Sequence, residues 1–156
     1  MHRMSNKSHA GRCAAWTFGL AGLALMLVAG CSGASKPKTI KVQGKVMYKG
    51  QPVTQGDVSF LPVKPAQGYP SRPATGTLKP DGTYQLTSFE ANDGAVPGEY
   101  QVSIVSKTGG PTPEEPDAQE EWHIPKKYGN PAESGLTATV SADASSPLEL
   151  NFTLED

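Results

Sequence analysis

From Thr39 to Asp156, apolar and polar residues alternate in short segments, and this period of two restricts the fold more than any other feature of the sequence. The clearest segment is TIKVQGKVMYKG, residues 39–50. Its apolar side chains, Ile40, Val42, Val46 and Tyr48, share one face, and Lys41, Gln43, Lys45 and Lys49 share the other. Such alternation is typical of a β-strand with one buried face.

Six later segments alternate in the same way, with decreasing clarity. They are GDVSFLPV (56–63), residues 74–79, TYQLTSF (83–89), GEYQVSIVS (98–106), LTATV (136–140) and LELNFTLED (148–156). Turns rich in Gly and Pro separate them, and Pro80-Asp81-Gly82 is a strong example. No segment beyond residue 39 has a convincing helical period, although a single turn near 120–122 fits the sequence. The pattern predicts an all-β domain over residues 40–156, a seven-stranded antiparallel β-sandwich.

The N-terminal segment has the composition of an export signal. Arg3, Lys7 and Arg12 precede an uncharged stretch, residues 13–30, that ends in small residues. A basic region followed by an apolar region predicts a signal helix in front of the sandwich. The stretch is near the lower limit for crossing a bilayer, so a retained transmembrane helix and simple secretion remain alternatives. No basic cluster follows the stretch directly, which argues against a retained helix.

Val28-Ala29-Gly30-Cys31 resembles a bacterial lipobox. The resemblance implies a lipoprotein signal peptide over residues 1–30, cleavage between Gly30 and Cys31, and a diacylglycerol thioether on Cys31, usually with an N-acyl chain. Two or more acyl chains anchor a protein stably, whereas one chain does so only marginally. Residues 31–39, CSGASKPKT, are then expected to be a flexible tether. Ser32 after the cysteine favours the outer membrane or cell surface by the Gram-negative sorting rules.

Cysteine and charge counts restrict the chemistry of the domain. The two cysteines are Cys13, inside the predicted signal, and Cys31, so the mature domain is expected to have no disulfide, zinc–thiolate site or cysteine nucleophile. Of the 14 Lys and Arg residues, three precede Cys31, which leaves 11 against 15 Asp and Glu, a net charge of about −4. This mildly acidic surface argues against nucleic-acid binding.

VQGKVMYKGQPVTQGDVSF, TGTLKPDGTYQL and DGAVPGEYQVSI resemble the carboxypeptidase regulatory-like, transthyretin-like family. The family pattern falls on Gly44/Val46, Gly50/Pro52/Val53, Gly56/Val58, Asp81/Gly82/Tyr84 and Pro97/Gly98/Tyr100/Val102. Residues 123–140 resemble the variant found in small lipoproteins of planctomycete-type bacteria. The resemblance implies a transthyretin-like or immunoglobulin-like sandwich with an accessory, non-catalytic role. The motif residues concern turns and burial, so they identify a fold rather than a function.

No set of residues in the sequence points to catalysis. The predicted mature chain has one histidine, His123, with no G-x-S-x-G elbow, no histidine pair at metal-ligand spacing and no phosphate-binding glycine motif. We therefore expect no catalytic residues, no metal, no cofactor and no enzymatic activity. Two alternatives stay open without support from the sequence. One is catalysis by two carboxylates that are distant in sequence. The other is calcium binding at the acidic residues of 114–121, which lack the ligand order of a calcium loop.

Residues 107–135 form a long connection without a strand period, and such connections tend to be functional or disordered. The first half is rich in Pro and acidic residues. The second half concentrates Trp122, Ile124, Pro125, Tyr128 and Pro131. These residues either fold back as a lid over one end of the sandwich or present Trp122 and Tyr128 as an exposed contact for a partner.

The sequence therefore predicts a non-enzymatic lipoprotein, lipid-anchored to the cell envelope, whose sandwich is a structural or protein-interaction module. Its expected partners are the membrane, through the lipid anchor, and envelope proteins or glycans. A carbohydrate-binding module at the cell surface is the alternative, suggested by the sandwich and by Trp122 and Tyr128.

Overall fold

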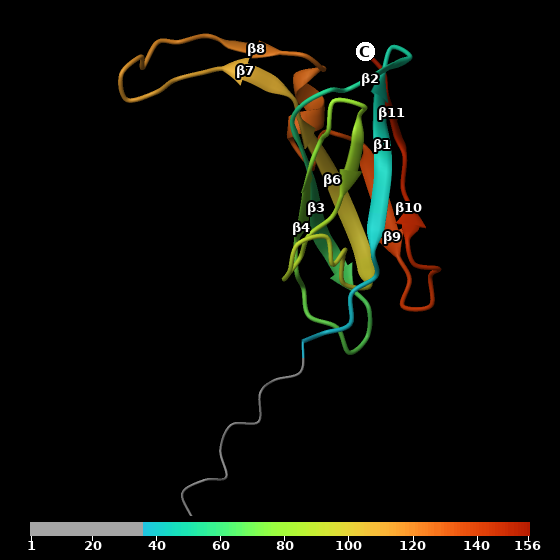
Figure 1. The fold of residues 1–156 in the computed structure, drawn as a ribbon. Coiled ribbons are helices and arrows are strands. Elements are labelled where there is room, and N and C mark those ends of the chain that lie inside the picture. Colours follow the sequence, from blue (N-terminus) through green and yellow to red (C-terminus); the bar gives the residue numbers. More distant parts are fainter. Residues whose placement is uncertain (1–35) are drawn as a thin grey trace, which may run out of the picture. The chain divides into compact units, whose positions relative to one another are not determined.

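The computed structural model describes residues 36–156, and this unit is an all-β sandwich (Figure 1). The predicted signal helix, the cleavage and lipidation positions Gly30 and Cys31, and residues 31–35 of the predicted tether lie outside the described residues. Residues 36–39 have no regular secondary structure, and Ile40 then forms a β-bridge with Ala95.

One sheet consists of four antiparallel strands in the order β4-β3-β6-β9. Their bounds are Asp57–Pro65 for β3, Ala74–Thr77 for β4, Gly98–Val105 for β6 and Leu136–Val140 for β9. The two long strands, β3 and β6, pair from one end to the other, with an irregularity between Pro62 and Lys64. They carry the alternation seen in the sequence, because Val58, Phe60, Val102 and Ile104 are all fully buried.

The second sheet is built on β1, Val42–Tyr48. Two short strands pair with it in antiparallel fashion, β2 (Gln51–Pro52) and β5 (Thr83–Gln85). Two others pair with it in parallel and in one continuous register, β10 (Leu148–Glu149) and β11 (Phe152–Leu154). A parallel pair needs a long crossover, and here nearly the whole sandwich lies between the two partners in sequence.

Each of the seven predicted segments contains a strand, and the last one is divided into β10 and β11. The parallel pairings of β1 are the exception to the predicted antiparallel arrangement. Three strands were not predicted: β2, β7 (Lys107–Gly109) and β8 (Glu120–Trp122). Segments of two or three residues are too short to display a period, so the sequence carries no alternation signal for them.

The division of the last strand follows from close packing at Gly44. A side chain there would place its Cβ 1.8 Å from the carbonyl oxygen of Leu150, so only glycine fits. The Tyr84 hydroxyl donates to the same oxygen at 2.7 Å. At this break the side chain of Asn151 supplies an acceptor in place of the backbone, because its Oδ1 accepts from the backbone N–H of Lys45 at 2.8 Å.

The core lies between the two sheets. Four of its aromatic rings, those of Phe60, Tyr84, Tyr100 and Phe152, lie within 6.5 Å of at least one other, measured between centroids. The Tyr100 hydroxyl donates to the backbone oxygen of Val96 at 2.5 Å, and burial raises the pKa of Tyr100 to about 12. Tyr84 and Tyr100 thus each combine a buried ring with a hydroxyl that donates a hydrogen bond.

Candidate interaction site at the capped end of the sandwich

After β6 the chain leaves the sandwich as a two-stranded arm, in which β7 pairs with β8 in antiparallel fashion. Figure 1 shows the arm projecting from the end of the sandwich that also holds β2. Within the predicted loop over residues 107–135 the structure therefore places β7, β8 and a short 3-10 helix, η1 (Lys126–Gly129). We call the arm, η1 and the β1–β2 turn the capped end.

Trp122 fastens the arm to η1. Its indole N–H donates to Oε2 of Glu120 at 3.0 Å, and the ammonium groups of Lys107 and Lys126 lie 5.6 and 6.0 Å from the ring centroid. The ring also packs on the backbone of Gly129, where an added Cβ would lie 2.8 Å from it. Trp122 is half-buried, so only part of its ring is open to a partner.

Glu120 has a second role at the root of the arm. Its Oε1 accepts a charged hydrogen bond from Lys107 at 2.5 Å, which ties β7 to β8 across the ladder. The bond from Lys107, and then the bond from Trp122, lower the pKa of Glu120 below its ordinary value. The root of the arm is therefore held by a pairing that requires an ionised carboxylate.

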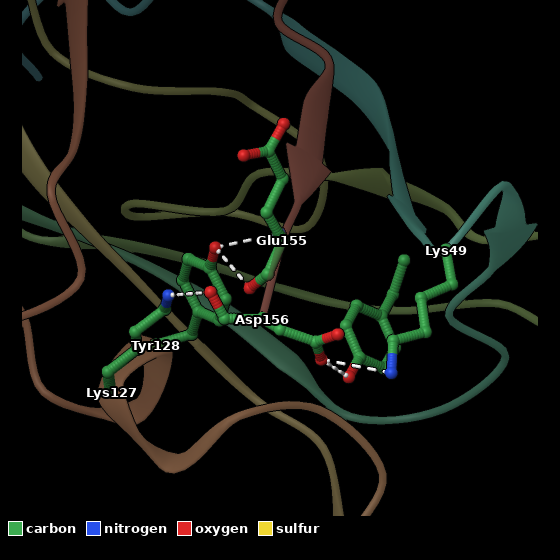
Figure 2. A network of polar contacts seen from close by, with 6 residues as sticks. Lys49, Lys127, Tyr128, Glu155 and Asp156 are labelled. Carbon is green, nitrogen blue, oxygen red and sulfur yellow. Dashed lines mark hydrogen bonds and ion pairs between the residues drawn. The ribbon is translucent and has the colours of Figure 1, made fainter.

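Tyr128, the other aromatic residue of the predicted contact, is buried, with only 6% of its surface exposed. Its hydroxyl donates to the backbone oxygen of Glu155 at 3.0 Å and accepts from the Glu155 N–H at 2.9 Å (Figure 2). Ile124 is buried as well. The ring of Tyr128 is thus unavailable as an exposed contact, because this part of the segment folds back over the sandwich.

Asp156 joins three segments at the capped end (Figure 2). Its carboxylate accepts from the Tyr48 hydroxyl at 2.6 Å and pairs with the Lys49 ammonium at 3.0 Å, and its backbone oxygen accepts from Lys127 at 2.8 Å. The Tyr48 bond and then the Lys49 bond lower the pKa of Asp156, and Asp156 raises that of Lys49. Sequence reasoning missed these residues because nothing local signals a contact between positions so far apart.

A cleft of about 360 Å³ opens beside this network and is lined in part by Tyr48, Gln55, Ser106 and His123. The His123 backbone N–H donates to the Ser106 carbonyl at 3.0 Å, and its ring Nε2 lies 2.8 Å from the Gln55 side-chain nitrogen. The Ser106 side chain is fully buried, and its hydroxyl has no hydrogen-bond partner within residues 36–156. Serine and histidine are therefore close in the fold, but the hydroxyl is shielded from any substrate.

In the described range, no group of three or more His, Cys, Asp or Glu residues is placed to hold a metal ion. The same range contains no helix that is long and apolar enough to span a bilayer.

Comparison with known proteins found little similarity. No protein-family model matches the chain, and no curated protein matches it. Among solved structures, a 9R-lipoxygenase from Cyanothece PCC8801 matches 77% of this chain, with a TM-score of 0.40 and 11% sequence identity. The match covers 17% of the lipoxygenase chain, so this chain spans about a sixth of that protein's length.

Proposed function

We propose that this protein is an exported lipoprotein, anchored through Cys31, whose transthyretin-like sandwich is a non-catalytic module that presents its capped end to partners in the cell envelope. The lipobox resemblance of Val28 to Cys31 supports the anchor. The observation that carries the interaction role is the placement of the two ends of the domain.

The chain enters the sandwich at Ile40, which bridges Ala95 just before β6 begins, and the arm starts at Lys107, directly after β6 ends. The eight residues of β6 separate these points by about 25 Å. The point at which the chain enters the domain and the start of the arm therefore lie at opposite ends of β6. The arm is exposed along β7 and at Glu121, as a contact surface requires.

A hydrolytic role is poorly supported by the capped end. The Ser106 hydroxyl has no access to solvent, and His123 contacts Gln55 rather than a nucleophile. A glycan contact that uses both Trp122 and Tyr128 is not supported, because Tyr128 is buried. Trp122 alone keeps a partly open ring.

Metabolic labelling with palmitate tests the anchor. We expect label in the wild-type chain and in Cys13→Ser, the matched control, and none in Cys31→Ser. Intact-mass measurement should find the acylated protein beginning at Cys31. An unlabelled wild-type chain, or label that persists in Cys31→Ser, would reject the lipoprotein assignment.

Site-specific photocrosslinking in intact cells tests the interaction role. A photoreactive residue at Glu114, in the arm, is compared with one at Gln67, an exposed position next to the end of β3 that pairs with the start of β6. We expect a discrete crosslinked product from position 114 and none from position 67. The reverse result would assign the contact to the opposite end of the domain.

A further inference from the structure

A polar groove runs across β5, and none of the residues that line it belongs to the capped end. Its larger part, about 740 Å³, lies over β3 and β4, and its smaller part, about 290 Å³, lies over β1 and the last strand. Gln85 and Lys79 line both parts and join them into one groove.

The groove follows a seam at which the two sheets meet without a continuous ladder. Thr75 and Thr87 form an isolated bridge, and the Lys79 N–H donates to the Thr83 carbonyl at 2.8 Å. Thr77 and Gln85 face each other between these two closures but form no bridge. Glycine at position 76 lets the backbone at the floor of the groove approach Gln85 closely, because an added Cβ would lie 2.5 Å from the Gln85 carbonyl oxygen.

Side-chain amides dominate the chemistry of the groove. Those of Gln85 and Asn92 are exposed and have no hydrogen-bond partner among residues 36–156. The Asn151 oxygen accepts from Lys45, and the Gln43 amide donates to Glu149 at 3.3 Å. Within residues 36–156, the Asn151 amino group and the Gln43 oxygen have no partner. An amide offers a donor and an acceptor side by side, which matches two neighbouring hydroxyl groups.

The charges that line the groove cancel. Two acidic residues, Asp57 and Glu149, are balanced by two basic residues, Lys45 and Lys79. Thr77 donates to Asp57 at 2.9 Å, which further engages that carboxylate. A groove of this kind provides no net attraction for a strongly charged ligand.

We propose that this groove binds a neutral oligosaccharide through pairs of adjacent hydroxyl groups, with Gln85 and Asn92 as the central contacts. An extended peptide fits less well, because a peptide is recognised along a free strand edge and this seam is closed at Thr75 and at Lys79. The proposal goes beyond the anchoring and arm-contact roles and does not depend on Cys31. It also places the glycan contact away from Trp122.

The expected affinity is low. No aromatic side chain lines the larger part of the groove, so stacking on a sugar ring contributes little there. With only a few exposed hydrogen bonds and little stacking, we expect a dissociation constant on the order of 1 mM.

Saturation-transfer NMR on the ligand detects binding of this strength and suits the full chain in a detergent without a sugar headgroup. The neutral probes are maltohexaose, laminarihexaose, mannohexaose and xylohexaose, and a galacturonic acid hexamer is the charged probe. We expect saturable transfer to at least one neutral probe. Loss of one hydrogen bond in Gln85→Ala or Asn92→Gly should weaken binding about fivefold.

Asn92 has a φ of 57°, so glycine rather than alanine removes its side chain without backbone strain. Gln101→Ala, an exposed glutamine on β6 that does not line the groove, is the matched control and should bind like the wild type. Three outcomes would overturn the proposal: no transfer to any neutral probe at about 10 mM, unchanged binding in both groove variants, or transfer to the charged probe alone.

Discussion

At the scale of single residues, two buried serines show how the effect of a buried hydroxyl on stability depends on its hydrogen bonds. The Ser134 hydroxyl donates to the Val102 carbonyl at 2.6 Å and accepts from the Leu136 N–H at 3.2 Å. The Ser106 hydroxyl is buried as well but has no partner in the described part of the chain. A buried hydroxyl without a partner costs free energy, whereas one with two partners stabilises the fold.

We therefore expect one substitution to have opposite effects at the two sites. Ser106→Ala should raise the free energy of unfolding by about 1 kcal/mol, because it removes an unsatisfied hydroxyl. Ser134→Ala should lower it by about 1 to 2 kcal/mol. Urea denaturation followed by circular dichroism measures both values. Destabilisation by Ser106→Ala would mean that its hydroxyl has a partner, such as a buried water.

The residue scale is also where sequence reasoning was both most and least informative. The expectation that Gly44, Tyr84 and Tyr100 serve the fold agrees with the close packing at Gly44 and with the hydrogen bonds of the two tyrosine hydroxyls. The burial of Tyr128 depends on Glu155, which is 27 residues away, so the sequence left its exposure open. The amides of Gln85 and Asn92 carried no signal, because polar residues at exposed positions are the ordinary case.

At the scale of elements, the last strand keeps its register through a side chain. β10 and β11 pair with β1 in the same register although residues 150–151 interrupt the strand. Asn151 bridges the interruption by accepting from Lys45. The alternation of Leu148, Leu150, Phe152 and Leu154 predicted one strand. It did not predict the break, which lies where Gly44 packs against the Leu150 carbonyl.

Asn151→Ala should therefore loosen the pairing of β11 with β1. We expect a loss of about 1 kcal/mol in the free energy of unfolding, because the Lys45 N–H loses its acceptor. Faster hydrogen exchange at the Lys45 amide should accompany the loss. Asn151→Asp keeps an acceptor oxygen and serves as the control, and equal exchange rates at Lys45 in the two variants would contradict the bridging role.

The arm is the element that the strand period did not predict, and its stability depends on ionisation. The pKa of Glu120 is lowered by Lys107 and Trp122, so the carboxylate stabilises the arm above its unfolded pKa of about 4.3. This contribution disappears as the pH falls through the lower folded value. The arm should then loosen in acid before the sandwich unfolds.

Trp122 emission reports this loosening in the mature protein, because Trp122 is the one tryptophan from Cys31 onward. We expect a red shift as the pH falls below about 4, and a Glu120→Gln variant whose emission no longer follows this step. Glu121→Gln, which changes the neighbouring exposed carboxylate, should titrate like the parent. An acid step that survives in Glu120→Gln would assign the transition to another group.

At the scale of the whole molecule, the first and last strands lie side by side, and the fold brings the β1–β2 turn, η1 and the C-terminal residues together at the capped end. Local alternation predicted the two layers because each strand records which of its faces is buried. It held no information on which distant segments meet, since that depends on the order and direction of the strands. The network in Figure 2 was therefore beyond sequence reasoning.

Asp156 offers a test of how far this network stabilises the whole domain. Its lowered pKa means that its contribution is present above the unfolded value of about 3.9 and is lost as the pH falls through the folded value. The raised pKa of Lys49 means that the contribution persists below about 10.4 and is lost as the pH rises through the folded value. Asp156→Asn should therefore be less stable than the wild type between these limits, and the two should converge at both extremes.

Glu155→Gln, in which only the side chain beside the Tyr128 contact changes, should follow the wild type throughout. Thermal unfolding of the three proteins from acid to alkaline pH measures the difference, and a gap that stayed constant into strong acid would show that the Asp156 carboxylate does not act through its charge.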